Sequence, residues 1–317
     1  MKRYMAALAL TAFAWMPSAQ AAEKVTILLD WFVNPDHATL VVAKEKGFFK
    51  AEGLDVDLVA PADPNDPPKL VAAGKADLAV SYQPQLHVQV AEGLPLVRVG
   101  TLVATPLNSL VVLKDGPVKS IADLKGRKVG FSVGGFEGTL LDAMLKKNGL
   151  SIKDVELVNV NFSLSPSLIA GQVDAVIGAY RNFELNQMDI VKAPGRAFYV
   201  EEEGVPSYDE LILIANNDNA DSEQVKHVLT ALQNAGTYLL NHPKESWQAF
   251  IKAYPELDDE LNRRAWADTL PRFALRPAAL DQGRYKRFAD FMKTSGMIDK
   301  TMDLNDYAID PFAGEKK

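Results

Sequence analysis

The chain has 317 residues and no cysteine. The absence of thiols excludes disulfides, cysteine nucleophiles, thiolate metal sites and a lipid anchored on a cysteine. The four histidines are scattered, and no His-x-x-x-His spacing occurs, so we expect no metal. There is also no Gly-x-Ser-x-Gly segment of the kind that carries a nucleophilic serine. The sequence therefore favours a protein without metal or other cofactor.

The chain has fewer basic than acidic residues, with 34 Lys and Arg and 41 Asp and Glu. Its net charge is therefore −7 and its pI is near 5.3. A general nucleic-acid binder would show an excess of positive charge on one face, so we expect no nucleic-acid partner. The charges form no long run of one sign, which is typical of a solvated surface. With 48% hydrophobic residues, the chain can build one large domain or two ordinary ones.

Long apolar runs are also missing. The longest, 5–16, is too short to span a bilayer. It follows the basic residues Lys2 and Arg3 and precedes Ala19-Gln20-Ala21, a small-residue cleavage pattern. We predict a signal peptide over 1–21, a mature chain free in the periplasm, and no lipid anchor. The alternative is an uncleaved membrane anchor.

Strand and helix patterns alternate twice along the chain. Such alternation predicts a parallel sheet with right-handed crossovers in each half. In the first half, strands are expected at 25–29, 55–59 and 77–81, and helices at 35–46, 69–73 and 84–91. In the second half, strands are expected at 128–133, 155–160 and 173–178, and helices at 136–147, 166–170 and 182–188.

Two adjacent strand patterns, 97–104 and 109–113, separate these halves and are expected to cross between lobes. A strand at 211–214 is expected to return to the first lobe. The remainder is helical, with aromatic residues at core spacings, over 222–240, 244–253, 258–268 and 277–294. We predict an α/β protein of two lobes, with 22–110 plus 211–317 in lobe 1, 111–210 in lobe 2, and a hinge of two crossing strands.

A short internal sequence repeat supports the two-lobe organisation. Residues 73–80 and residues 170–177 have the same pattern of helix end, glycine, turn and buried strand. A tyrosine follows each strand, Tyr82 in the first half and Tyr180 in the second. Because the match falls at the third strand of both halves, a shared architecture is expected.

The polar cluster after the first strand is the leading candidate site. Asp30, Trp31, Asn34 and His37 arrive within eight residues. In open α/β sheets, ligands bind beyond the carboxyl ends of strands. An aromatic ring beside a carboxylate and an amide suits a flat heterocycle with hydrogen-bonding edges. The equally weighted alternative is that Trp31 is core and that Asp30 and Asp36 cap the next helix.

Several other polar residues each have two interpretations, one functional and one structural. Glu137, in the glycine-containing stretch 133–139, either meets a ligand or favours the helix dipole. This stretch lacks the Gly-Lys-Ser/Thr of a phosphate-binding P-loop. His37 is more often a hydrogen-bonded structural residue than a metal ligand. Arg181 is expected to pair with a carboxylate and not with the ligand. The acidic set of Asp30, Glu137 and Glu184 disfavours a phosphorylated ligand and favours a ligand rich in hydrogen-bond donors, such as an aminopyrimidine.

Three blocks resemble one family, over about 25–191. They are Asp30-Trp31 with Asn34, His37 and 43–56; 74–84; and 174–184. This pattern resembles the substrate-binding proteins of ABC importers for pyrimidine precursors of thiamine, a family that includes yeast hydroxymethylpyrimidine synthase. The block 46–54 is shared with sulfonate and nitrate binders, whereas the Asp-Trp-x-x-Asn and Asn-Phe-Glu segments are narrower. The synthase branch consumes its own pyridoxal phosphate and uses a cysteine-rich block, from which this chain departs.

The resemblance implies a type II periplasmic-binding-protein fold, no catalysis, and a monomer that delivers a pyrimidine to an inner-membrane ABC permease. By matching position, Trp31 would stack on the pyrimidine, and Asp30 and Glu184 would contact its amino group and ring nitrogens. The alternatives are another small ligand, such as a sulfonate, riboflavin or a different heterocycle, or an enzyme on the same fold. The predicted ligand-binding set is Asp30, Trp31, Asn34, His37, Ser81, Tyr82, Gly135, Phe136, Glu137, Tyr180, Asn182 and Glu184.

Overall fold

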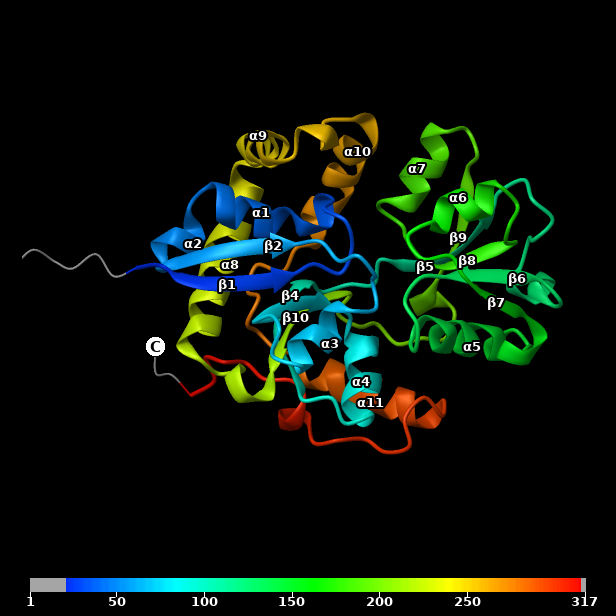
Figure 1. The fold of residues 1–317 in the computed structure, drawn as a ribbon. Helices are drawn as coiled ribbons and strands as arrows, with labels where there is room; N and C mark the ends of the chain where they lie inside the picture. The colour runs from blue at the N-terminus through cyan, green and yellow to red at the C-terminus, as the bar shows by residue number, and fades with distance from the viewer. Residues whose placement is uncertain (1–20, 315–317) are drawn as a thin grey trace, which may run out of the picture.

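The structure, a computed structural model, describes residues 21–314 and contains two α/β lobes that lie side by side (Figure 1). The first lobe is built on a five-stranded sheet in the order β2-β1-β3-β10-β4. Its first three strands are parallel, and β10 runs antiparallel to both β3 and β4. The strands are β1 (Glu23–Leu28), β2 (Leu54–Val59), β3 (Leu78–Ser81), β4 (Leu96–Val103) and β10 (Leu211–Asn216).

The second lobe repeats this topology, in the order β7-β6-β8-β5-β9. Here β7, β6 and β8 are parallel, and β5 is antiparallel to its neighbours. Of the two tyrosines that come after the repeated segments, Tyr82 follows β3 and Tyr180 ends the equivalent strand β8. The strands are β5 (Asn108–Leu113), β6 (Lys128–Phe131), β7 (Glu156–Asn159), β8 (Ala175–Tyr180) and β9 (Gly195–Tyr199).

The chain passes between the sheets twice. The first passage is 104–107, between β4 and β5, and the second is 203–210, before β10. Each strand stays within one sheet. The chain therefore crosses between the lobes through these two short irregular segments, and not through the pair of crossing strands that the sequence predicted. The predicted lobe boundary at residue 110 falls inside β5, which pairs only with second-lobe strands.

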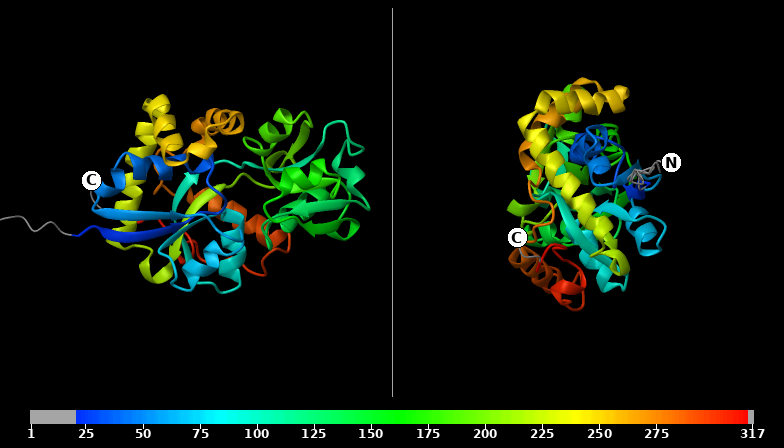
Figure 2. Two further views of the ribbon diagram at one scale, coloured as in Figure 1. Left: turned by 45° about the horizontal axis from the view of Figure 1, so that its top comes forward. Right: turned by 90° about the vertical axis from the view of Figure 1, so that its left-hand side faces the viewer.

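Helices cover both sheets (Figures 1 and 2). In the C-terminal part, α10 of the first lobe packs against α7 of the second. The α-helices up to residue 190 are α1 (Ala38–Glu45), α2 (Phe48–Ala51), α3 (Pro67–Ala72), α4 (Gln83–Ala91), α5 (Glu137–Lys147), α6 (Leu164–Ile169) and α7 (Glu184–Ile190). The others are α8 (Glu223–Asn241), α9 (Pro243–Ala253), α10 (Glu260–Thr269) and α11 (Gln282–Thr294).

The aromatic residues of the C-terminal helices form core, as predicted. Phe250 and Phe288 are fully buried, and Trp266 is 7% exposed. The ring of Trp247 lies 5.2 Å from that of Trp266. Helices α8 and α9 also pack against α1, which fastens the helical tail to the first lobe. No helix within residues 21–314 is long and apolar enough to cross a membrane.

Several local expectations were wrong in detail. The turn before α1 is capped by Asn34 and not by Asp36, because the Asn34 side chain accepts a hydrogen bond from the Asp36 backbone N–H. The strand β9 was missed, and 277–281 precede α11 without being helical. The predicted signal peptide lies outside the described residues, apart from residue 21.

Candidate functional site

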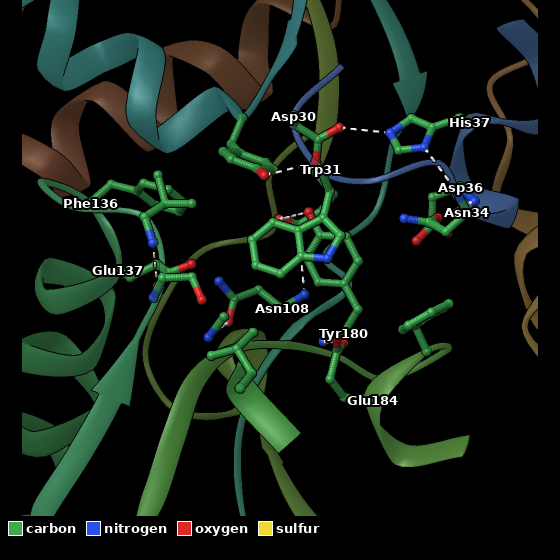
Figure 3. Close-up of a pocket in the computed structure, with 17 residues that line it drawn as sticks. Asp30, Trp31, Asn34, Asp36, His37, Asn108, Phe136, Glu137, Tyr180 and Glu184 are labelled. Atoms are coloured by element: carbon green, nitrogen blue, oxygen red, sulfur yellow. Dashed lines mark hydrogen bonds and ion pairs between the residues drawn. The ribbon is translucent and has the colours of Figure 1, made fainter. Parts of the chain in front are cut away.

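A pocket opens between the lobes, where the carboxyl ends of β1, β3, β6 and β8 meet (Figure 3). It holds about 510 Å³ between protein atoms, counting the part that is open to solvent. The lining residues are Asp30, Trp31, Asn34, Asp36, His37, Tyr82, Asn108, Ser132, Val133, Phe136, Glu137, Leu164, Gly178, Tyr180, Phe183, Glu184 and Glu210.

The first lobe contributes a linked set of polar groups. Asp30 follows β1, and its Oδ1 lies 2.9 Å from Nε2 of His37. Its Oδ2 accepts a 2.8 Å hydrogen bond from the Tyr82 hydroxyl. The other imidazole nitrogen, Nδ1, accepts from the backbone N–H of Asn34 at 3.3 Å, so the imidazole donates through Nε2 to Asp30. Both ring nitrogens of His37 are used within the protein, and one of them holds the Asp30 carboxylate in place. These contacts match the interpretation of His37 as a hydrogen-bonded structural residue.

The second lobe presents two glutamates in equivalent places. Glu137 is the first residue of α5, and its Oε2 accepts from the backbone N–H groups of Ser132 (2.8 Å) and Val133 (3.1 Å), just after β6. Glu184 is the first residue of α7, and its Oε2 accepts from the N–H of Tyr180 at 2.6 Å, at the end of β8. In both cases one oxygen is held by the backbone. The other oxygen, Oε1, is not used in these contacts.

A third glutamate joins the two interlobe passages. Glu210, fully buried, ends the second passage, and its Oε2 accepts from the N–H groups of Leu107 (2.6 Å) and Asn108 (2.9 Å) in the first. Tyr208 donates to the same oxygen at 3.1 Å. The Tyr180 hydroxyl lies 3.4 Å from Oε1. Glu210, which lines the pocket, thus links the two connections between the lobes.

Five carboxyl groups line the pocket, and each belongs to a buried residue: Asp30, Asp36, Glu137, Glu184 and Glu210. Burial, with a smaller contribution from neighbouring carboxylates, raises the pKa of Glu137 and of Glu184 to about 8. Burial likewise raises the pKa of Glu210 to about 7 and that of Asp36 to about 6. Backbone N–H donors oppose these shifts at the three glutamates. Near neutral pH, some of these groups can therefore donate a hydrogen bond and others accept one.

No cationic lysine or arginine lies among the described residues that line the pocket. Arg181 is bound elsewhere, as expected from the sequence: its guanidinium meets both oxygens of Glu201, at 2.6 and 2.9 Å. Within 21–314, no group of three or more His, Asp or Glu side chains could hold a metal ion. The charge character of the pocket is acidic.

Trp31 lies across the middle of the pocket (Figure 3). Although it follows β1 of the first lobe, it is half-buried against an apolar cluster of the second lobe that includes Leu164. Trp31 thus lines the pocket and also packs against a core cluster, which belongs to the opposite lobe.

Nine of the twelve predicted site residues line the pocket, and three do not. Ser81 is fully buried and donates to Gln85 at 3.0 Å within its own lobe. Gly135 lies outside the lining, although its neighbours Phe136 and Glu137 are in it. Asn182 donates across the lobes to Asp36 at 2.6 Å and to Thr269 at 2.7 Å. Its contacts hold the lobes together beside the pocket.

Sequence reasoning missed part of the lining. Asp36 was weighed only as a helix cap. Asn108 and Glu210 each come immediately before a predicted strand. A polar residue just outside an apolar run was the sequence signal that could have identified them. The remaining missed residues are Ser132, Val133, Leu164, Gly178 and Phe183.

Two α/β lobes of one topology, joined by two crossings and enclosing a lined pocket, define the periplasmic-binding-protein fold. The alkanesulfonate-binding protein of Xanthomonas axonopodis pv. citri, solved with MOPS bound, has this architecture. It superposes with a TM-score of 0.72 over 92% of this chain and 99% of its own, at 20% identity. At that identity, the likeness concerns the fold alone.

The chain belongs to the NMT1/THI5-like family, which it matches over residues 34–246. A Haemophilus influenzae protein named for thiamine biosynthesis is 60% identical over 291 residues, 92% of this chain and 93% of its own. The formylaminopyrimidine-binding protein of Halalkalibacterium halodurans is 35% identical over 258 residues, 79% of this chain and 77% of its own. A relative in Aspergillus parasiticus named 4-amino-5-hydroxymethyl-2-methylpyrimidine phosphate synthase is 27% identical, over 90% of this chain and 86% of its own.

Proposed function

We propose that this protein is the periplasmic solute-binding component of an ABC importer and that it binds an aminopyrimidine precursor of thiamine between its lobes. The observation that carries the proposal is the pairing of one indole with several buried carboxyl groups in the same pocket. The relative named for formylaminopyrimidine binding supports the same ligand class.

The chemistry of the carboxyl groups suits an aminopyrimidine. A protonated carboxyl group donates to a ring nitrogen through its hydroxyl and accepts from the adjacent exocyclic amine through its carbonyl oxygen. The pKa of Glu184 and of Glu137, raised to about 8 by burial, keeps this protonated form available at neutral pH. One oxygen of each is held by backbone N–H groups, so the side chains are oriented before the ligand arrives.

A sulfonate is the less favoured ligand. Relatives in fold bind such anions, yet the lining of this pocket carries five acidic side chains and no lysine or arginine among the described residues. Placing a sulfonate beside buried carboxylates would be opposed by like charge, and no cation would compensate it. Riboflavin or another heterocycle remains an alternative with compatible chemistry.

We further propose that the protein does not catalyse a reaction, in contrast to the relatives named as synthases. The sequence lacks the cysteine-rich block of the synthase branch, since it has no cysteine. The proposed setting is the periplasm, after removal of residues 1–21. The proposed partners are the small ligand and a membrane permease, and the proposed state is a monomer.

Two measurements test the proposal. Mass spectrometry of small molecules released from the purified, denatured protein should identify an aminopyrimidine. Calorimetric titration with hydroxymethylpyrimidine and formylaminopyrimidine should show saturable one-site binding, with no turnover on prolonged incubation. Tight binding of an alkanesulfonate, or binding of neither pyrimidine, would refute the proposed ligand class.

A further inference from the structure

Four aromatic rings from the two lobes meet at and beside the pocket. Trp31 and Phe32 follow β1 in the first lobe, whereas Phe162 follows β7 and Phe183 precedes α7 in the second. We call this set the aromatic bridge. Its ring centroids are separated by 4.5 Å for Trp31 and Phe162, 6.2 Å for Phe32 and Phe162, and 6.1 Å for Phe32 and Phe183.

The contact between Trp31 and Phe162 has a defined geometry. The two rings meet edge to face, with an interplanar angle of 70°. This arrangement is favourable because the positive edge of one ring meets the negative face of the other. Phe162 does not line the pocket, whereas Trp31 does. Phe162 therefore supports the indole from outside the pocket, and it does so from the opposite lobe.

The backbone before Phe162 is held in an unusual conformation. Asn161 has a φ of 50°, in the left-handed region that few residues other than glycine adopt. Its N–H donates to Oδ1 of Asn159 at 2.8 Å, and its carbonyl accepts from the hydroxyl of Ser132, a pocket-lining residue. Strained residues persist where the surrounding contacts over-determine them, often beside binding sites. Here the strained turn places Phe162 against Trp31 and couples the turn to the pocket wall.

Phe32 extends the contact to the surface. Its side chain is 41% exposed, which is high for a phenylalanine, yet it touches rings from both lobes. The apolar surface that it shares with Phe162 and Phe183 is covered only while the lobes are together. The aromatic bridge thus adds an attraction between the lobes beside the pocket.

We propose that Phe162 is a positioning residue: it fixes the plane of the Trp31 indole for stacking, and the aromatic bridge slows the escape of the bound ligand. This inference rests on the proposed function, because the stacked ligand is the aminopyrimidine proposed above. Loss of Phe162 should act mainly on the dissociation rate, since affinity changes within one site arise mostly there.

The first test replaces Phe162 with leucine, which keeps an apolar side chain and removes the ring. Phe162→Leu should weaken hydroxymethylpyrimidine binding roughly 3- to 10-fold, mainly through faster dissociation in stopped-flow measurements. Phe198→Leu is the matched control, because Phe198 is also half-buried in the second lobe but does not line the pocket or join the bridge. It should bind like wild type. Equal binding by Phe162→Leu and wild type would overturn the inference.

The second test moves Phe162 without removing it. Asn161→Val disfavours the left-handed backbone and should weaken binding as Phe162→Leu does, whereas Asn161→Gly accommodates that backbone and should bind like wild type. If both Asn161 variants bind like wild type, the strained turn does not serve the site and the coupling is refuted.

The third test needs no ligand, so it separates this inference from the proposed function. Fluorine NMR of protein labelled with 5-fluorotryptophan should give a Trp31 signal, assigned by its loss in Trp31→Phe. That signal should shift in Phe162→Leu, while those of Trp247 and Trp266 stay in place. An unmoved Trp31 signal would overturn the inference. Failure of wild type to bind any pyrimidine would instead overturn the proposed function.

Discussion

The Glu137 carboxylate occupies the space that a side chain at Gly178 would fill. A Cβ atom built on Gly178 would lie 2.8 Å from Cδ and 2.9 Å from Oε2 of Glu137. Gly178 also has a φ of +99°, which a residue with a side chain adopts only under strain. A glycine inside β8 therefore allows a buried glutamate to lie against the strand within the pocket.

Gly178→Ala is expected to destabilise the protein and displace Glu137. The variant combines backbone strain with overpacking, so it should lose about 1–3 kcal/mol more unfolding free energy than Gly171→Ala. Gly171 is the matched control because it also has a positive φ but nothing lies within 4 Å of its Cβ position. Urea denaturation measures both variants, and equal losses would show that Glu137 does not fill this space in solution.

The stability of the ligand-free protein should fall as the pH rises through the neutral range. Burial raises the pKa of Glu137 and Glu184 from 4.5 to about 8, so the folded state binds protons that the unfolded state has released. Their contribution is fully present below pH 4.5 and is lost as the pH rises through about 8. Each proton involved corresponds to a slope of about 1.4 kcal/mol per pH unit.

Denaturation midpoints between pH 5 and pH 9 test this expectation. Glu137→Gln and Glu184→Gln should each flatten the dependence, because glutamine cannot ionise. Glu92→Gln, at an exposed position on the first lobe, should leave it unchanged. A stability that rises with pH in wild type would contradict the proposed protonation of the buried carboxyl groups.

Trp31→Ala should weaken pyrimidine binding roughly 30- to 100-fold, since stacking and burial of the ring contribute on the order of 2–3 kcal/mol. The melting temperature of the ligand-free protein should change little, because Trp31 is half-buried at the cleft and outside the core of its own lobe. Titration calorimetry and thermal melts decide between the two roles. If Trp31→Ala unfolds the protein, the indole is a structural element and the stacking role fails.

Glu184→Ala should cost about 1–3 kcal/mol of binding free energy, because its loss leaves the ring nitrogen and the exocyclic amine of the ligand without partners. Glu184→Gln is the matched control: its amide keeps a donor and an acceptor, and its carbonyl oxygen can still accept from the Tyr180 N–H, so it should bind nearly like wild type. Calorimetric titration of both pyrimidines measures the two variants. Wild-type affinity in Glu184→Ala would remove Glu184 from the site.

Asn182→Ala should favour separation of the lobes. Asn182 is buried and donates to Asp36 and Thr269 of the opposite lobe, so its loss removes two hydrogen bonds between the lobes. We expect a larger radius of gyration without ligand and compaction when saturating ligand is added, both measured by small-angle scattering. Asn186→Ala is the control, since its contact with Asp268 is exposed. An unchanged radius in all states would argue against hinge closure.

The sequence by itself determined the two α/β halves, because apolar periodicity and turn residues act locally and are visible along the chain. It also pointed to the Asp30–His37 stretch, since polar residues directly after a buried strand stand out from their neighbours. The repeat of Tyr82 and Tyr180 at equivalent strand ends could be read in the same way.

Only the tertiary structure decided which distant residues share the pocket. Glu210 and Asn108 are 102 positions apart and meet because both interlobe passages run through the same place. The strand β9 pairs at a sheet edge, and its half-buried residues carry little of the apolar pattern that identifies a strand. Asn182 was expected at the ligand, but its side chain is used by Asp36 and Thr269, a contact that exists only when the lobes are packed together. Burial, and with it the raised pKa of the pocket glutamates, likewise arises only when both lobes exclude water from the same space.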